Sequence, residues 1–552
     1  MANFSISGNI VDVLHKTIFP GTVFINNGRI QAIAYGEAQP NAQKNGHSED
    51  QYILPGFIDA HVHIESSMLV PTEFARLATV HGTVAAVSDP HEIANVLGLE
   101  GIRFMLANAA QTPFTIVFGA PSCVPATRFE TAGAELTAKE IRELFEQDGI
   151  SYLSEVMNVP GVLNRTTEVM EKIRIAQELG YPVDGHAPGL CGEAARHYAD
   201  AKITTDHECC TLAEALDKLA VGMKIIIREG SAAKNFETLH SLIDSHPDRC
   251  MFCSDDKHPD DLVKGHINEL VRRAVALGHD VMNVLQIACV NPVSHYKMNV
   301  GLLQVGDPAD LIVVKNLQDF TVVSTYCKGI LAAKSGQAML PSVPVTPINH
   351  FLAAQKQVAD FRIPANGSTV RAIAAVDGQL TTTEKHLPAH IQNGEVTSDI
   401  EHDVLKITVV NRYKNTPPAV GFIQNFGLKR GAIASSVAHD SHNIVAVGTT
   451  DEELCAAVNA VIEAQGGLAV VDNTTIQVLN LPVAGLMSDA DGYMVAKQYA
   501  HMDSWAKRLG SQLLAPFMTL SFMALLVIPD LKLSDRGLFS GKDFQFVSLW
   551  IA

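Results

Sequence analysis

One pattern constrains this chain more than any other, because it occurs eight times between residues 52 and 256. A short apolar run is followed by polar or small residues, and then by a helix-like stretch rich in alanine, leucine and charged residues. The runs span residues 52–63, 83–92, 114–121, 150–158, 181–189, 203–209, 224–230 and 250–256. Strands that alternate with helices indicate parallel β/α units, and eight units predict an α/β fold with a closed (β/α)8 barrel of the TIM type.

Nearly every run ends in residues that can bind a metal or exchange a proton. The active sites of such barrels lie at the C-terminal ends of the strands, so these side chains should share one site. Several of the 22 histidines must be structural, but a repeat of this pattern at nearly every strand end is hard to produce by accident. The residues are His61, His63, Asp89, His91, Glu92, Glu155, His186, His207, Glu208, Arg228, Glu229, Asp255 and Asp256.

His61 and His63 lie two positions apart on the first strand, so both side chains point to the same face, here the barrel interior. That spacing suits two ligands of one metal ion. The alternative, a pair of polar core histidines, would leave two buried rings in need of partners, which costs free energy without an ion. The pair therefore favours a metal site.

Four more strand-end residues complete a candidate ligand set. Glu155 follows apolar positions that alternate toward the core, and buried carboxylates are rare unless they are paired or bound to a metal. His186 and His207 occupy equivalent positions on the fifth and sixth strands, and Asp255 ends the eighth. Together with the first-strand pair they supply four imidazoles and two carboxylates, enough for two ions that share one carboxylate bridge.

The barrel, assigned to residues 51–299, is flanked by two β-rich pieces with alternating apolar and polar residues. Residues 1–50 carry a turn signal at Asn27-Gly28, and residues 300–344 contain the apolar run 311–314. We expect the two pieces to pair into one small β-sandwich. A proline-rich segment, residues 341–347, introduces a C-terminal α+β domain assigned to residues 345–552.

The composition of the chain limits the kinds of partner that it can bind. The formal net charge is −18 over 552 residues, so the chain lacks the positive field that attracts nucleic acid or anionic lipid. The most apolar stretch, residues 513–528, falls short of the roughly 20 residues of a membrane helix, and we expect it in the core. An odd number of scattered cysteines, nine, and an N-terminus without a signal-peptide pattern favour a reduced, cytoplasmic protein.

At this point the motifs resemble a known family. The run PGFIDAHVHIESS at 55–67 is similar to the first-strand signature of the amidohydrolase superfamily, and its last four residues resemble the adenine deaminase branch. Further similarities to that branch follow in order along the whole chain. They are SDPHEI at 88–93, EVMN at 155–158, DGH at 184–186, IREGSAA at 227–233, CSDD at 253–256 and the stretch 431–448.

The resemblance implies a metal-dependent hydrolase that converts adenine to hypoxanthine and ammonia with a metal-activated hydroxide, in purine salvage. Many members of the superfamily bridge two metals with a carboxylated lysine on the fourth strand, but residues 150–160 contain no lysine. The resemblance implies that Glu155 takes that place. The expected metal ligands are His61, His63, Glu155, His186, His207 and Asp255.

The expected cofactors are two divalent metal ions. Because the ligand set contains no thiolate, Mn²⁺ or Fe²⁺ is at least as suitable as Zn²⁺. We expect free adenine as the substrate, no nucleic-acid or membrane partner, and a homo-oligomer, specifically a dimer. The alternatives are a dihydroorotase-like hydrolase of cyclic amides and a catalytically silent scaffold.

The proton-transfer role stays open among the nearby carboxylates. The expected catalytic residues are Asp255, Asp256, Glu92, His91 and Asp89. Asp255, Glu92 and Asp256 are candidates for moving a proton to the purine nitrogens, although Glu92 and Asp256 could instead hold ligand histidines in orientation.

The C-terminal domain carries a second histidine motif, formed by His439, Asp440 and His442. A further metal site, a lid over the active site and a satisfied surface turn all fit these residues, so they are not part of the expected site.

Overall fold

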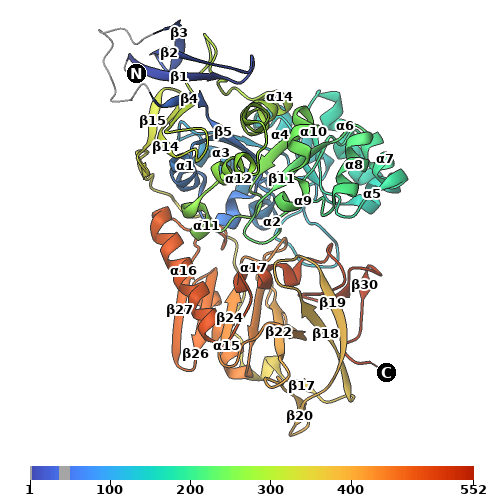
Figure 1. Cartoon of the computed structure of the whole chain (residues 1–552). Helices are drawn as coiled ribbons and strands as arrows, with labels where there is room; N and C mark the ends of the chain where they lie inside the picture. The colour runs from blue at the N-terminus through green and yellow to red at the C-terminus, as the bar shows by residue number, and fades with distance from the viewer. Residues whose placement is uncertain (1–2, 37–49, 552) are drawn as a thin grey trace.

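The computed structural model describes residues 3–36 and 50–551, in three parts (Figure 1). The barrel lies in the middle of the molecule, with a sheet that contains the N-terminal strands at one end and the C-terminal domain at the other. Of the piece expected at residues 1–50, residues 37–49 lie outside the described part of the chain.

Within residues 50–551, eight parallel strands form the barrel. They are β5 (Phe57–Val62), β6 (Thr83–Ser88), β7 (Thr115–Phe118), β8 (Leu153–Val156), β9 (Val183–Gly185), β10 (Thr205–Asp206), β11 (Lys224–Arg228) and β12 (Cys250–Cys253). A bridge between Ala120 and Leu153 joins β7 to β8, β9 contacts β10, and a bridge between Val62 and Asp255 joins the first strand to the last. The ring is therefore closed, and the predicted (β/α)8 fold is confirmed.

Helices connect the strands and cover the outside of the barrel (Figure 1). The main ones are α1 (Pro71–Val80), α2 (His91–Leu97), α3 (Leu99–Ala109), α4 (Ala138–Gln147), α6 (Thr167–Glu178), α7 (Gly192–Asp200), α8 (Leu212–Ala220), α11 (Pro259–Lys264) and α12 (Ile267–Ala276). Their start signals are local: α4, for example, begins at a capping box of Thr137 and Glu140. Its buried residues Ile141, Leu144 and Phe145 recur every one to three positions along one face, which turns toward the barrel.

The two β-rich pieces that flank the barrel in sequence share one sheet. Its hydrogen-bonded order is β16 (Gln337–Ala338), β15 (Ile330–Lys334), β14 (Val322–Cys327), β13 (Leu311–Val314), β4 (Tyr52–Pro55), β1 (Phe4–Asp12), β2 (Thr17–Asn26) and β3 (Arg29–Tyr35). The sheet curls on itself, because the Ile30 amide donates to the Asp307 carbonyl and the Ala309 amide donates to the Gly28 carbonyl. The curled sheet encloses an apolar core of its own.

The first apolar run, residues 52–63, is two strands rather than one strand of the barrel. β4 pairs with β1 and β13 of the flanking sheet, and the barrel begins only at β5. Gly56 separates them at a point where a Cβ would come within 2.2 Å of the Val84 side chain of β6. The expected barrel start at residue 51 therefore lies before a strand of the flanking sheet. Hydrophobic pattern could not reveal this division, because both strands are buried.

The C-terminal domain is built on an eight-stranded sheet. Its order is β19 (Thr382–Pro388), β18 (Thr369–Ala375), β23 (Ala419–Gln424), β22 (Val404–Val410), β25 (Ile444–Gly448), β24 (Ala432–Ser435), β26 (Gly467–Asp472) and β27 (Thr475–Asn480). Helix α15 (Asp451–Glu463) packs on β24, β25 and β26, while α16 (Gly492–Arg508) contacts α1 and α11 of the barrel. The hairpin of β28 (Leu531–Ser534) and β29 (Gly537–Ser540) lies near the end of the chain.

The apolar stretch 513–528 forms α17 (Pro516–Ser521) and a short 3-10 helix, η5 (Phe522–Ala524), and most of its residues are buried. α17 lies where the C-terminal domain faces the barrel (Figure 1). None of the helices in residues 3–36 and 50–551 combines the length and the apolar character needed to cross a bilayer.

Two carboxylates of the C-terminal domain anchor it to the barrel. Asp535 accepts hydrogen bonds from the amide and the hydroxyl of Thr131, at 3.0 and 2.7 Å. On another side, Asp491 accepts from the guanidinium of Arg76 at 2.7 Å. These contacts hold the domain over the C-terminal ends of the barrel strands, where the expected site lies.

Candidate metal centre and active site

The six expected metal ligands come from five strand ends, and the structure brings all six together. His61 and His63 end β5, Glu155 lies in β8, and the others follow β9, β10 and β12. Each side chain is buried, with at most 8% of the residue exposed. The repeated pattern at the strand ends thus corresponds to one cluster in space, because the parallel strands of a barrel have their C-terminal ends on the same face.

The first half of the cluster contains His61, His63 and Asp255. The Nε2 atoms of the two histidines are 3.3 Å apart and lie 3.5 and 3.2 Å from the same carboxylate oxygen, Oδ1 of Asp255. Three ligand atoms from the first and last strands, which are neighbours in the closed ring, therefore point at a common space.

Glu155 links this half to a second one, because its two oxygens face different imidazoles. Oε1 lies 3.3 Å from His63 Nε2. Oε2 lies 2.8 Å from His186 Nδ1 and 3.1 Å from His207 Nε2. A carboxylate that offers one oxygen to each of two ligand sets has the arrangement of a bridge between two ions.

The donor set fits a pair of divalent ions. Two imidazole nitrogens 3.3 Å apart, each facing the other, need a shared cation or proton between them. The Nδ1 atoms of His61 and His207 are buried without a hydrogen-bond partner in the described residues, so the outward nitrogen does not set the orientation of either ring. Nitrogen and oxygen donors without a thiolate suit Mn²⁺, Fe²⁺ and Zn²⁺.

Electrostatics keep both ligand carboxylates ionised. Burial alone would raise the pKa of Glu155, but His186, His207 and His63 hold it well below its usual range. Burial would likewise raise the pKa of Asp255, and the guanidinium of Arg228 is the main group that lowers it. Anionic carboxylates are the forms that bind metal ions.

Arg228 is bound to carboxylates of the site through both of its terminal nitrogens. It donates to Asp255 and to both oxygens of Glu208. Its neighbour Glu229 lies outside the cluster, in an ion pair with Arg273 at 3.0 Å. The structure therefore makes Arg228 part of the ligand scaffold and Glu229 a peripheral ion-pair residue.

Asp256, next along the chain, behaves differently from Asp255. Burial raises the pKa of its carboxyl group, and His439 and His63 only partly oppose this. Its Oδ1 accepts a hydrogen bond of 2.5 Å from the Ser66 hydroxyl. Of the three expected proton carriers, Asp256 is thus the one whose pKa is raised, whereas the pKa values of Asp255 and Glu92 are lowered.

Asp89 and His91 lie beside the cluster in different roles. Asp89 Oδ2 is 3.1 Å from His91 Nδ1, and the Asp89 carbonyl lies 3.1 Å from His63 Nδ1. His91 lines the cavity at the metal-ligand cluster, whereas Asp89 does not. Asp89 thus contacts two imidazoles and does not face the cavity.

Glu92 meets two histidines of the C-terminal domain. Its carboxylate binds His439 through Nδ1 and His442 through Nε2, and all three side chains are buried. These imidazoles, with His91, hold the pKa of Glu92 well below its usual range although burial opposes this. The structure therefore places His439 and His442, which the expected site omitted, at the candidate site. Because both are buried, the surface-turn interpretation is wrong.

A small cavity of about 30 Å³ lies at this cluster. Its walls include ligands, Glu92 and Asp256 from the barrel and, from the C-terminal domain, Leu380, His439, Asp440, Phe522 and Leu525. The active-site wall is thus made by both domains.

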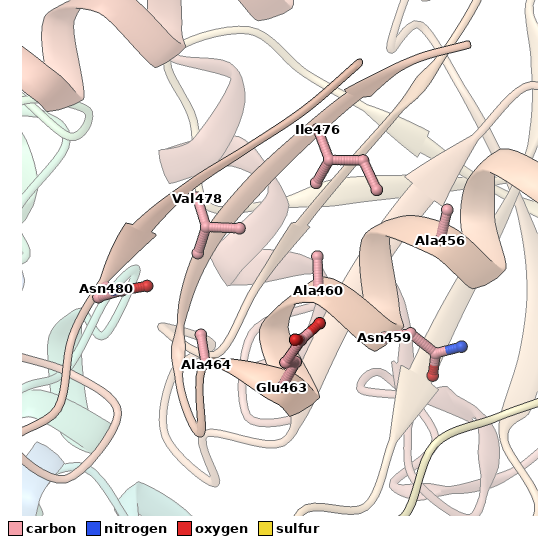
Figure 2. A pocket seen from close by; sticks show the side chains of 8 residues that line it. All are labelled: Ala456, Asn459, Ala460, Glu463, Ala464, Ile476, Val478 and Asn480. Carbon is pink, nitrogen blue, oxygen red and sulfur yellow. The ribbon is translucent and has the colours of Figure 1, made fainter. Parts of the chain in front are cut away.

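A larger hollow lies elsewhere, on the sheet of the C-terminal domain. Figure 2 shows its lining between α15 and the edge strand β27. It contains no imidazole and a single carboxylate, Glu463, so it lacks the residues of a hydrolytic site.

A buried cluster of four imidazoles and two carboxylates at the C-terminal end of a (β/α)8 barrel defines a metal-dependent hydrolase of the amidohydrolase class. The model of the amidohydrolase family matches residues 52–331, and the model of the adenine deaminase C-terminal domain matches residues 379–545.

Three relatives match over nearly their whole length. An adenine deaminase of Salinibacter ruber is 52% identical over 100% of this chain and 99% of the relative. That of a Sulfurovum species is 53% identical, over 98% of each chain, and that of Borreliella burgdorferi is 47% identical, over 99% of each. The chain belongs to the adenine deaminase family, which confirms the resemblance seen in its motifs.

Proposed function

We propose that this chain hydrolyses adenine to hypoxanthine and ammonia. The observation that carries the proposal is the position of Glu155, whose two oxygens face two separate sets of imidazoles inside the barrel. The full-length similarity to adenine deaminases supports adenine as the substrate. The full-length similarity to adenine deaminases disfavours a cyclic amide as the substrate, and the presence of all six expected ligands disfavours a silent scaffold.

His61, His63 and Asp255 would hold one divalent ion, His186 and His207 would hold the other, and Glu155 would bridge them. We propose Mn²⁺ or Fe²⁺, on the grounds of the nitrogen and oxygen donor set. Such a pair, when bound, supplies the Lewis acidity that makes water a competent nucleophile near neutral pH.

The carboxylates then divide the proton transfers. Asp255, kept ionised by Arg228, accepts the proton of the attacking water. Asp256, whose pKa burial raises, passes the two protons of the water, which Asp255 takes up in turn, to the ring nitrogen and the departing amine of the substrate. Glu92, kept ionised by its imidazole partners, fixes the position of His91 and His439 around the substrate.

We further propose a cytoplasmic homodimer that acts in purine salvage. All nine cysteines lie in the described residues and are free, which suits a reducing compartment. The exposed edge strand β27 and the apolar hollow beside it, where Ile476 is 49% exposed, suit contact with a second copy (Figure 2). The oligomeric state can be measured by light scattering of the purified protein, where the mass of a monomer would contradict the proposed dimer.

Free adenine should be turned over far better than adenosine. A small cavity lined by buried imidazoles and carboxylates, and closed by Leu380, Phe522 and Leu525, rejects a ribose sterically, and its polar groups stay unpaired when the base cannot approach. The test compares kcat/KM of the Mn²⁺-loaded protein on adenine, adenosine, guanine, cytosine and a cyclic amide, with metal analysis of the same sample. Comparable efficiency on adenosine, or a preference for the cyclic amide, would refute adenine as the substrate.

A further inference from the structure

The catalytic cavity is too small for the proposed substrate as it stands. Its volume of about 30 Å³ is about a tenth of the roughly 300 Å³ or more that substrate sites usually measure. Two fused rings cannot enter unless part of the wall moves. The barrel side of the wall consists of strand ends, so the movable candidates come from the C-terminal domain.

A roomier chamber lies directly behind that part of the wall. It has a volume of about 530 Å³ and is lined by Ser231, His258, Tyr499 and Phe522 among others. A third space, a closed passage too narrow for a water molecule, shares Leu380, Phe522 and Asp256 with the catalytic cavity. It shares Ala232 and Phe522 with the chamber. Phe522 contributes to all three spaces, and Leu380 to the cavity and the passage.

Both wall residues are held by one buried lysine. The Nζ atom of Lys532, in β28, donates to the carbonyl oxygens of Leu380 and Phe522, at 2.7 and 2.9 Å. Lys532 is 0% exposed, and within residues 3–36 and 50–551 no carboxylate forms an ion pair with it. Burial lowers its pKa to about 7. Burying a lysine amino group without a counterion costs free energy. The two hydrogen bonds to the carbonyls of Leu380 and Phe522 are the interactions that offset this cost.

We infer that Leu380 and Phe522 form a movable wall between the outer chamber and the catalytic cavity, and that Lys532 is the positioning residue that holds this wall closed. Substrate enters from the chamber when the wall opens. Phe522 has a defined closed position, because its ring stacks on His439 at 4.6 Å with an interplanar angle of 9°. The inference depends on the proposed function only for the identity of the substrate.

Lys532→Met removes both hydrogen bonds while keeping a long apolar side chain. The matched control is Lys356→Met, in the same domain. Lys356 is 5% exposed and donates to Asn415 Oδ1 and the Thr416 carbonyl at 2.9 Å, but lines none of the three spaces. Phe522→Ala removes the wall itself, and so tests the inference even if Lys532→Met folds poorly.

The first measurement is the rate at which a small chelator, dipicolinate, strips Mn²⁺ from each loaded protein. Lys532→Met and Phe522→Ala should lose metal about tenfold faster than the parent protein. Lys356→Met should lose metal at a rate within about twofold of that of the parent protein. Equal rates in all four proteins would overturn the inference. So would an equal acceleration in Lys532→Met and Lys356→Met, which would reveal general loosening.

The second measurement separates the wall from the chemistry. In Lys532→Met the KM for adenine should rise more than kcat falls, because the cavity is less well formed but its ligands are intact. A fall in kcat with unchanged KM would count against the wall. If the parent protein does not turn over adenine, the proposed function fails, while the chelator rates still decide whether the wall exists.

Discussion

At the scale of single residues, Glu155 is the residue that we expect to tolerate substitution least. Each of its oxygens faces imidazole nitrogens at about hydrogen-bond distance, and both oxygens carry charge because its pKa is low. An amide in its place would turn an NH2 group toward one of the two ligand sets.

Glu155→Gln should therefore lose bound metal, and adenine turnover by orders of magnitude, while the fold persists. The measurements are metal content, kcat and far-UV circular dichroism of the same sample. Depleting carbon dioxide should change nothing in the parent protein, because no carboxylated lysine is expected. Activity that depends on added bicarbonate would mean that another residue provides the bridge.

His442 belongs to a different layer of the site, since it touches Glu92 and none of the six expected ligands. His442→Ala should leave metal content unchanged and lower kcat/KM by about 10- to 100-fold, the usual cost of losing such a supporting partner. A matched loss of metal and activity would contradict this role and would make His442 a ligand. His402→Ala, an exposed histidine of the same domain, is the control.

The sequence could predict the six residues that cluster in the barrel, but not the contacts of His439 and His442 with Glu92, because these partners lie far apart along the chain. His61 and His63 can be recognised from the sequence because they lie two positions apart on one strand. Glu155 can be recognised because it is a charged residue within an apolar run. His439 and His442 form a visible motif, but their partner Glu92 lies 347 and 350 residues earlier. No local pattern reports a contact of that kind.

At the scale of elements, the junction of β4 and β5 shows how one residue divides two sheets. The eight apolar runs predicted the barrel strands because each strand is short, buried and followed by a helix. They could not predict that β4 leaves the barrel, since hydrogen-bond partners decide this and burial is the same in both sheets. Gly56 marks the division by close packing against Val84.

Gly56→Ala should destabilise the protein by about 1–3 kcal/mol, because the new methyl group overlaps the Val84 side chain. The measurement is the free energy of unfolding from denaturant titration. Adding Val84→Ala should restore part of the loss, since it vacates the same space. Equal and additive losses from the two substitutions would show that the two positions are not coupled.

At the scale of the whole molecule, the active site exists only where the two domains meet. The barrel contributes the ligands and Glu92, and the C-terminal domain contributes the histidine partners and the wall residue Phe522. The anchors Asp491 and Asp535 keep these surfaces together from two sides.

Removing both anchors, as Asp491→Ala and Asp535→Ala in one chain, should loosen the domain contact. We expect faster proteolysis within residues 341–347 and a lower kcat/KM, while metal content stays the same because the barrel ligands are untouched. The double variant is compared with Asp319→Ala, an exposed aspartate of the flanking region. Unchanged kcat/KM together with faster proteolysis would mean that domain closure does not govern the reaction.

The contact between Glu92 and His442 also has a consequence for biosynthesis. Glu92 leaves the ribosome 350 residues before His442, an interval of about 18 to 70 seconds at roughly 5–20 residues per second. In the later part of this interval, after Asp255 has emerged, a nascent chain carries all six expected ligand residues, yet the carboxylate of Glu92 still has neither of its histidine partners. Newly made barrels can collect metal ions during translation, but their catalytic surroundings are completed only when the last third of the polypeptide is being made.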